Sequence, residues 1–435
     1  MYFGGKVYEK TLDLNLKAED FEKECELKIA LALYDCFTIA TDYTAQWGIL
    51  TGVRPAKLFS RLSNSIGEEN AIEYFENTLK VNPKKISLCK KAVQGEGEIT
   101  SLSRPDSYSL YISIPFCPTR CSYCSFVSHS VESAKKLIPV YIEKLCEELK
   151  ITAQIAKENS LRLETIYIGG GTPTSITHTQ LETLMLTVKE NFDLQNLREY
   201  TVEAGRPDTI TAEKLQVIKK FGATRISINP QTMNDDVLKS IGRCHTALDT
   251  VNAFKLAREI GFDNINMDLI AGLPSDTEKS FTETLSKVLE LNPESVTVHS
   301  LSIKRSSKIN VSGELPEKSI GETASFMVDY ANEQLSNAGI FPYYMYRQSK
   351  TVGNLENVGY AKLGYECLYN VYIMDETHSI LACGASAVTK LREPNGSYIE
   401  RIFNFKYPYE YIDRFDELIS RKAGITSFYK NYEFN

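Results

Sequence analysis

The stretch "YISIPFCPTRCSYCSF" (residues 111–126) joins an alternating apolar run to three closely spaced cysteines. The run has the two-residue period of a β-strand. Three residues separate Cys117 from Cys121 and two separate Cys121 from Cys124, so one loop can turn all three sulfurs toward a common point. The stretch therefore predicts a strand that ends in a loop lined by thiols.

Similar apolar and β-branched runs recur downstream, separated by helical patterns of three- and four-residue steps. The runs predict six strands, at residues 109–115, 164–171, 199–205, 223–230, 264–272 and 295–303. The helical patterns fall at 135–158, 178–191, 211–220, 246–260 and 276–290. Thr211 and Ser275 are expected to cap two of these helices.

Alternation of strands and helices predicts a parallel sheet with the helices outside, as a doubly wound sheet or a partial barrel. Both layouts bind ligands at the carboxyl ends of the strands. The cysteines follow the first strand, "GGGTPT" follows the second, Glu203 ends the third, Gln231 follows the fourth and Asp268 lies in the fifth. We therefore expect these residues to meet at one edge of the sheet.

The flanking regions lack this regular alternation of strands and helices. Residues 1–105 read as a helical accessory domain with Trp47, the only tryptophan, in its core. The core domain is expected at 106–305. A helix closed by Gly339 then opens an α+β tail, residues 306–435, which is expected to cover the sheet and the substrate.

Composition narrows the class of protein. The 435 residues carry a net charge of -7 and are 43% hydrophobic, which indicates a globular chain rather than a disordered one and disfavours a general nucleic-acid binder. The sequence shows no apolar run long enough for a membrane span and no apolar signal-peptide core. Seven further cysteines are scattered singly, as in a reducing compartment. These features predict a cytoplasmic protein without a membrane span.

Three thiolates in one loop suit few kinds of site. An odd number disfavours disulfides, and structural zinc needs a fourth ligand, for which His129 is the nearby candidate. A 4Fe-4S cluster held by three cysteines leaves one iron open to an outside ligand. The cluster is favoured, with zinc and simple packing as the alternatives.

The motif "CPTRCSYC" resembles the CxxxCxxC motif of the radical S-adenosylmethionine (SAM) superfamily, which has a partial (β/α)6 barrel. The segments "IYIGGGTPT", "RISINPQTMND", "IGRCH" and "NMDLIAGLPSDT" resemble motifs of the oxygen-independent coproporphyrinogen III dehydrogenase family. Outside the barrel, "WGILTGVRPAK" and "GNLENVGYAK" are similar to its HemZ-type branch.

The resemblance implies roles for individual residues. It implies that Cys117, Cys121 and Cys124 hold a 4Fe-4S cluster whose open iron binds SAM. It places the methionine amino group on the loop of Gly170, Gly171 and Thr172, and the methionine carboxylate on Arg243. The remaining SAM contacts that it implies are the carboxylate Glu203, the adenosine-binding Gln231 and Asp268, and the pocket-lining Tyr111 and Tyr123. It names no general acid or base.

The same resemblance implies an oxidoreductase that converts coproporphyrinogen III to protoporphyrinogen IX through a 5'-deoxyadenosyl radical, in haem biosynthesis. The partners would be a tetrapyrrole and an electron donor such as flavodoxin or ferredoxin. Basic residues should meet the substrate carboxylates; the candidates are Arg120, Lys304, Arg305, Arg347 and Lys350.

One departure keeps alternatives open. The best-known members of the family have a fourth cysteine after the third, where this chain has Ser125 and Phe126. Relatives of that kind include haem chaperones and radical enzymes that act on other tetrapyrroles. The haem-chaperone branch has a histidine-containing motif where this chain has "GNLENVGY", which disfavours a haem chaperone without removing it.

Overall fold

The computed structural model describes residues 1–17, 19–124, 126, 128–303 and 318–432. Its centre is one sheet in the order β11-β12-β10-β9-β8-β7-β6-β3-β13-β14-β15. The six predicted strands form its parallel middle; they are β3 (Ser107–Ile114), β6 (Arg162–Gly170), β7 (Glu199–Glu203), β8 (Arg225–Ser227), β9 (Ile265–Ala271) and β10 (Ser295–Ser300).

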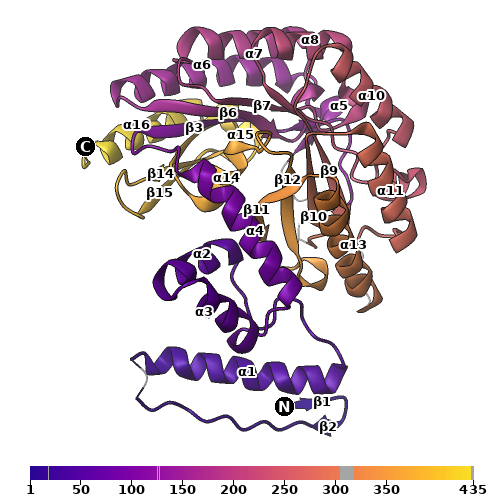
Figure 1. The fold of residues 1–435 in the computed structure, drawn as a ribbon. Coiled ribbons are helices and arrows are strands. Elements are labelled where there is room, and N and C mark those ends of the chain that lie inside the picture. The colour runs from indigo at the N-terminus through magenta and orange to yellow at the C-terminus, as the bar shows by residue number, and fades with distance from the viewer. Residues whose placement is uncertain (18, 125, 127, 304–317, 433–435) are drawn as a thin grey trace.

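Helices cover the outer face of the curved sheet (Figure 1). Five of them connect successive strands; they are α6 (Leu137–Glu158), α7 (His178–Asn191), α8 (Ala212–Lys220), α10 (Ala247–Glu259) and α11 (Glu278–Leu291). Two short helices, α5 (Val131–Ala134) and α9 (Asp235–Ser240), lie in the connections. The predicted α/β fold, with its partial barrel, is confirmed.

One of the two predicted caps is correct. Thr211 caps α8, because its Oγ accepts a hydrogen bond from the Lys214 amide at 3.4 Å. Ser275 was the wrong residue: its φ of 64° is left-handed, and Thr277 caps α11 by accepting from the Ser280 amide at 3.1 Å. A turn thus moves the helix start two residues downstream of the expected cap.

The N-terminal region is mostly helical. It contains β1 (Tyr2–Phe3), β2 (Lys6–Val7), α1 (Phe21–Thr41), α2 (Pro55–Ile66), α3 (Glu68–Glu73), the π-helical η1 (Tyr74–Thr78) and α4 (Pro83–Thr100). Trp47 is buried, and its Nε1 donates to Glu356 of β12 at 2.7 Å. Glu356 also accepts from the buried Lys85 of α4 at 2.6 Å, so this region is tied to the C-terminal tail.

The tail extends the sheet at both edges. It contributes α13 (Lys318–Asn337), β11 (Phe341–Arg347), β12 (Glu356–Ala361), α14 (Leu368–Asp375), β13 (Ser379–Cys383), β14 (Val388–Arg392), β15 (Ile399–Phe403), α15 (Pro408–Asp413) and α16 (Phe415–Tyr429). β12 pairs antiparallel with β10, while β13 pairs parallel with β3. Gly339, with φ of 75°, follows α13 as expected.

The three-domain division stays a proposal, and its boundary at 305/306 lies outside the described residues. No helix in the described part of the chain is both long and apolar enough to cross a lipid bilayer.

Candidate active site

The three cysteines line one small cavity of about 80 Å³. Cys117 belongs to β4 (Phe116–Cys117), which pairs with β5 (His129–Ser130). Cys121 and Cys124 lie in the following turn, where the Cys124 amide donates to the Cys121 carbonyl at 3.2 Å. The Ser122 amide donates to the Ile241 carbonyl at 3.0 Å, which fixes the turn to the barrel. The loop thus turns its three sulfurs toward one space.

The electrostatics of the loop suit a cationic metal centre. Burial raises the pKa of the Cys124 thiol, and the neighbouring Cys121 and Cys117 sulfurs raise it further, because adjacent thiolates repel. Iron bound to the sulfurs would offset that repulsion. Within the described ranges, no three His, Cys, Asp or Glu side chains are close enough to hold a single metal ion. A 4Fe-4S cluster does not need the three sulfurs around one ion, because each cysteine binds a different iron.

His129, the candidate fourth ligand for zinc, lies elsewhere. Its ring packs edge-on against Tyr407 and Tyr409, at 6.4 and 6.3 Å between centroids. It lines neither the small cavity nor the larger one beside it.

The glycine loop after β6 packs directly on the cysteine loop. A Cβ on Gly171 would lie 2.7 Å from the Phe116 carbonyl oxygen and 3.0 Å from the Cys117 sulfur. Gly170 has φ of 109°, a conformation that favours glycine. Thr172 donates to the Cys117 sulfur at 3.5 Å. Only a residue without a side chain at position 171 can pack so closely against the Cys117 sulfur.

A larger cavity of about 560 Å³ adjoins the small one, and the two share Tyr123, Cys124, Gly171, Glu203, Asn229 and Arg243. The larger cavity also contains Tyr111, Gly170, Gln231 and Asp268. The small cavity contains Cys117, Cys121 and Thr172. The structure therefore brings all twelve predicted site residues to two connected cavities.

Glu203 and Asp268 are two partly buried carboxylates with different environments. Burial raises the pKa of Glu203 to about 7, although Tyr167 donates to it at 2.5 Å. Burial also acts to raise the pKa of Asp268, but His299 and Asn266 outweigh it and the pKa lies below its usual value. Asn266 donates to Asp268 at 2.6 Å. Asp268 is therefore the permanent anion of the pair.

The backbone at Gln231 extends the sheet at this edge. Gln231 adopts φ of 68°, its amide donates to the Asp268 carbonyl at 2.9 Å and its carbonyl accepts from the Ile270 amide at 3.0 Å. This bridge turns the buried residue toward the cavity, beside Asp268.

Arg243 and Asn229 carry polar atoms without partners. The Nε and Nη1 of Arg243 and the Oδ1 of Asn229 are buried and have no hydrogen-bond partner in the described part of the chain. A third nitrogen of Arg243 donates to Tyr123 Oη at 2.8 Å. Because unpaired buried polar atoms cost free energy, these groups indicate a bound polar ligand. A guanidinium with two free donors suits a carboxylate.

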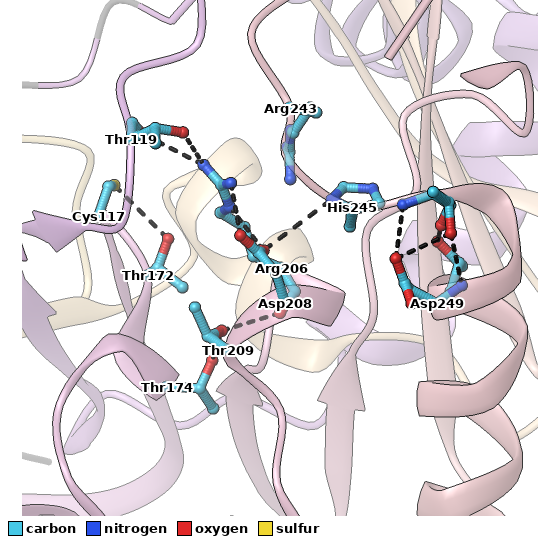
Figure 2. A network of polar contacts seen from close by, with 12 residues as sticks. Cys117, Thr119, Thr172, Thr174, Arg206, Asp208, Thr209, Arg243, His245 and Asp249 are labelled. Atoms are coloured by element: carbon cyan, nitrogen blue, oxygen red, sulfur yellow. Dashed lines mark hydrogen bonds and ion pairs between the residues drawn. The ribbon is translucent and has the colours of Figure 1, made fainter. Parts of the chain in front are cut away.

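A buried arginine holds the cysteine loop against the end of β7. Figure 2 shows Arg206 between Thr119 and Asp208. Its guanidinium donates to Thr119 Oγ1 at 2.8 Å and to both Asp208 oxygens at 3.0 and 2.8 Å. His245 lies on the far side, with Nδ1 3.9 Å from Asp208. Burial lowers the pKa of His245 to about 4, so the ring is neutral at pH 7.

Three tyrosines form a stacked wall in the larger cavity. Tyr167 lies 4.5 Å from Tyr369 and 6.2 Å from Tyr111, measured between ring centroids. Tyr369 comes from α14 of the tail, so the tail contributes directly to the cavity.

Sequence reasoning missed several residues of this cavity. Arg225, Ser227 and Asn229 line it at two-residue spacing, and that alternation in "RISIN" was a usable signal. The tail residues Tyr369 and Lys390 had no comparable signal.

Two of the five predicted substrate-binding cations, Arg347 and Lys350, lie outside both cavities. Arg347 is buried, donates to the Leu50 carbonyl at 2.6 Å and covers the Trp47 ring at 5.4 Å, so it holds the N-terminal region. Lys350 is exposed and lines neither cavity. Arg120 lies at the small cavity. Lys304 and Arg305 lie outside the described residues.

Comparison with known proteins agrees with this geometry. A family model described as the radical SAM superfamily matches residues 111–288. The fold and the match define a radical SAM protein, a class that uses a 4Fe-4S cluster and SAM as its cofactors. Over 404 residues the chain is 39% identical to the oxygen-independent coproporphyrinogen-III oxidase-like protein HemZ of Bacillus subtilis, covering 92% of this chain and 81% of that relative. The chain belongs to this HemZ-like family of radical SAM proteins.

Two further similarities bear on function and fold. The chain is 31% identical over 331 residues to the heme chaperone HemW of Haemophilus influenzae, covering 75% of this chain and 80% of that one. The solved structure of coproporphyrinogen III oxidase (HemN) from Escherichia coli matches with a TM-score of 0.56 and 23% identity, over 74% of this chain and 71% of that one. The likeness to the HemN structure, at 23% identity, shows a shared fold and no more.

Proposed function

We propose that this protein is a radical SAM oxidoreductase that decarboxylates coproporphyrinogen III oxidatively to protoporphyrinogen IX. In this proposal Cys117, Cys121 and Cys124 hold the cluster. Arg243 binds the methionine carboxylate of SAM, and the loop of Gly170, Gly171 and Thr172 accepts its amino group. The observation that carries the proposal is the pair of free, buried donors on Arg243 beside the cysteine-lined cavity.

The remaining site residues would orient SAM and exclude water. Glu203, when ionised, would face the sulfonium or the ribose hydroxyls, and Gln231 and Asp268 would bind the adenosine. Tyr111 and Tyr123 line the larger cavity and would contact SAM there. When bound, the two cofactors supply a 5'-deoxyadenosyl radical, which takes a hydrogen atom from the substrate. Burial of the site protects such a radical from solvent.

The tetrapyrrole substrate is supported by the cavity and by the relatives. The stacked wall of Tyr111, Tyr167 and Tyr369 suits a large ring. The HemZ relative is described as coproporphyrinogen-III oxidase-like. Each decarboxylation would release CO2 from a propionate and leave a vinyl group; the hydrogen atom would go to the 5'-deoxyadenosyl radical and the remaining electron to an external one-electron acceptor. Flavodoxin or ferredoxin is the proposed electron donor for the cluster.

A haem chaperone is the second candidate, because one relative named heme chaperone HemW, from Bacillus subtilis, is 41% identical over 45% of this chain. It predicts stable haem transfer without porphyrinogen turnover. The test is an anaerobic reaction of reduced, cluster-loaded protein with SAM and coproporphyrinogen III, followed by mass spectrometry. Vinyl products and 5'-deoxyadenosine are expected for the enzyme. Haem transfer without vinyl products would favour the chaperone.

A further inference from the structure

One wall of the larger cavity comes from the tail and ends in a lysine. We call it the tail wall; it consists of Ile373, Met374, Ile380, Val388 and Lys390. Lys390 pairs with Ile380 across β13 and β14, and Ile380 pairs with Ser109 of β3. Because side chains alternate along a strand, Val388 and Lys390 share one face of β14. The tail wall therefore combines four apolar side chains with the one cation Lys390.

Lys390 is half-buried and has no counter-ion in contact. Among the described residues its ammonium makes no hydrogen bond and no ion pair within 4 Å. Burial lowers its pKa, and the positive charges of Arg54 and Arg401 lower it further, against the attraction of Glu376. A partly buried ammonium without a partner is a ready site for an anion.

Two arginines surround the carboxylate next to Lys390. Glu376 follows α14 directly. Its carboxylate forms ion pairs with the guanidinium groups of Arg54 at 2.5 Å and Arg401 at 3.2 Å. Lys57 donates to the carbonyl of Asp375 at 2.7 Å. Four cations thus gather around two carboxylates, in a chain whose net charge is -7. Glu376 is already shared by two arginines, which leaves the charge of Lys390 available.

We propose that Lys390, supported by Arg54 and Arg401, binds a carboxylate of the tetrapyrrole while the apolar part of the tail wall contacts its ring. This inference rests on the proposed function and deepens it, because it names the residues that select a polycarboxylate. Arg54 lies in "WGILTGVRPAK" and pairs with Glu376. The N-terminal segment therefore places a positive charge near the tail wall. Lys390 is a specificity residue and takes no part in SAM binding.

The test compares two porphyrins on cluster-loaded, anaerobic protein. Coproporphyrin III carries four carboxylates, and its tetramethyl ester has the same ring without their charge. Binding of each is titrated by absorbance with wild type, Lys390→Gln, Lys390→Arg and Arg54→Gln, and with Lys430→Gln as an exposed control outside the cavity. Lys390→Gln should weaken binding of the acid about tenfold or more and leave the ester unchanged.

The outcomes separate this site from the proposed function. Lys390→Arg should keep most of the affinity, Arg54→Gln should lose a smaller part, and Lys430→Gln should match wild type. Equal binding of the acid by wild type and Lys390→Gln would overturn the site alone, and so would equal loss of acid and ester. If wild type binds neither porphyrin, the tetrapyrrole function and this site both fail.

Discussion

Tyr167 donates a hydrogen bond to Glu203 at 2.5 Å inside the cavity, yet the pKa of Glu203 stays near 7 because burial opposes its charge. The carboxyl group therefore holds a proton in the folded protein at pH values where the unfolded chain has lost it. Folding and proton binding are coupled at this residue.

The first prediction concerns stability against pH. The contribution of Glu203 is fully present below about pH 4.5, its unfolded pKa, and is lost as the pH rises through about 7. Across this window, cofactor-free wild type should lose about 3 kcal/mol of unfolding free energy relative to Glu203→Gln. Urea denaturation of both proteins at pH 4.5 to 8 measures it. A constant difference across the window would contradict the raised pKa.

The second prediction concerns Arg243. If its free donors bind the carboxylate of SAM, Arg243→Gln should weaken SAM binding about tenfold or more. Iron content should stay at the wild-type level, because the substitution keeps all three cysteines and the hydrogen bond that it removes goes to Tyr123 Oη. Equilibrium dialysis with SAM gives the affinity. Unchanged affinity would assign these donors to another ligand.

The third prediction concerns the packing of the glycine loop on the cysteine loop. Gly171→Ala places a methyl group 2.7 Å from the Phe116 carbonyl oxygen, so it should destabilise the protein by about 1–3 kcal/mol and lower its iron loading. Gly97→Ala in α4 is the matched control, since its methyl group meets open space. That control should be neutral or more stable by up to about 1 kcal/mol. Full iron loading in Gly171→Ala would show that the loop tolerates displacement.

The fourth prediction concerns the link between α4 and β12. Lys85→Met leaves the buried carboxylate of Glu356 without its ammonium partner, which should cost about 3–5 kcal/mol. Exposed Lys84→Met should change stability by less than about 0.5 kcal/mol. Urea unfolding curves separate the two. Similar curves for both variants would mean that Lys85 is not needed to compensate Glu356.

Local patterns in the sequence predicted much of this molecule. The six parallel strands follow from two-residue alternation. The meeting of the cysteines, the glycine loop, Glu203, Gln231 and Asp268 follows from their place at strand ends, because parallel strands present those ends on one edge. Arg243, Tyr111 and Tyr123 were implied by the family resemblance alone. Thr211 was recognisable as a cap because a threonine directly before a helical pattern is a local signal as well. Ser275 was not a cap, because a left-handed turn at this residue shifts the helix start to Thr277.

Contacts between distant segments were beyond such reasoning. The position of β13 beside β3 depends on tertiary packing, and with it the place of Tyr369 and Lys390 in the cavity. Arg347 shows the same limit, since its charge suggested a substrate contact while the fold buries it against Leu50 and Trp47. A charged side chain carries no sequence signal for the surface that it will face.

The most direct test of the central claim is iron and acid-labile sulfide analysis of anaerobically reconstituted protein, with electron paramagnetic resonance after reduction. Wild type should bind about four irons and four sulfides per chain and show a reduced-cluster signal that changes when SAM is added. Replacing Cys117, Cys121 or Cys124 by alanine should abolish the signal, while Cys36→Ala, at a buried cysteine of α1, should not. Stoichiometric zinc in place of iron, or a full cluster in all three variants, would contradict the account.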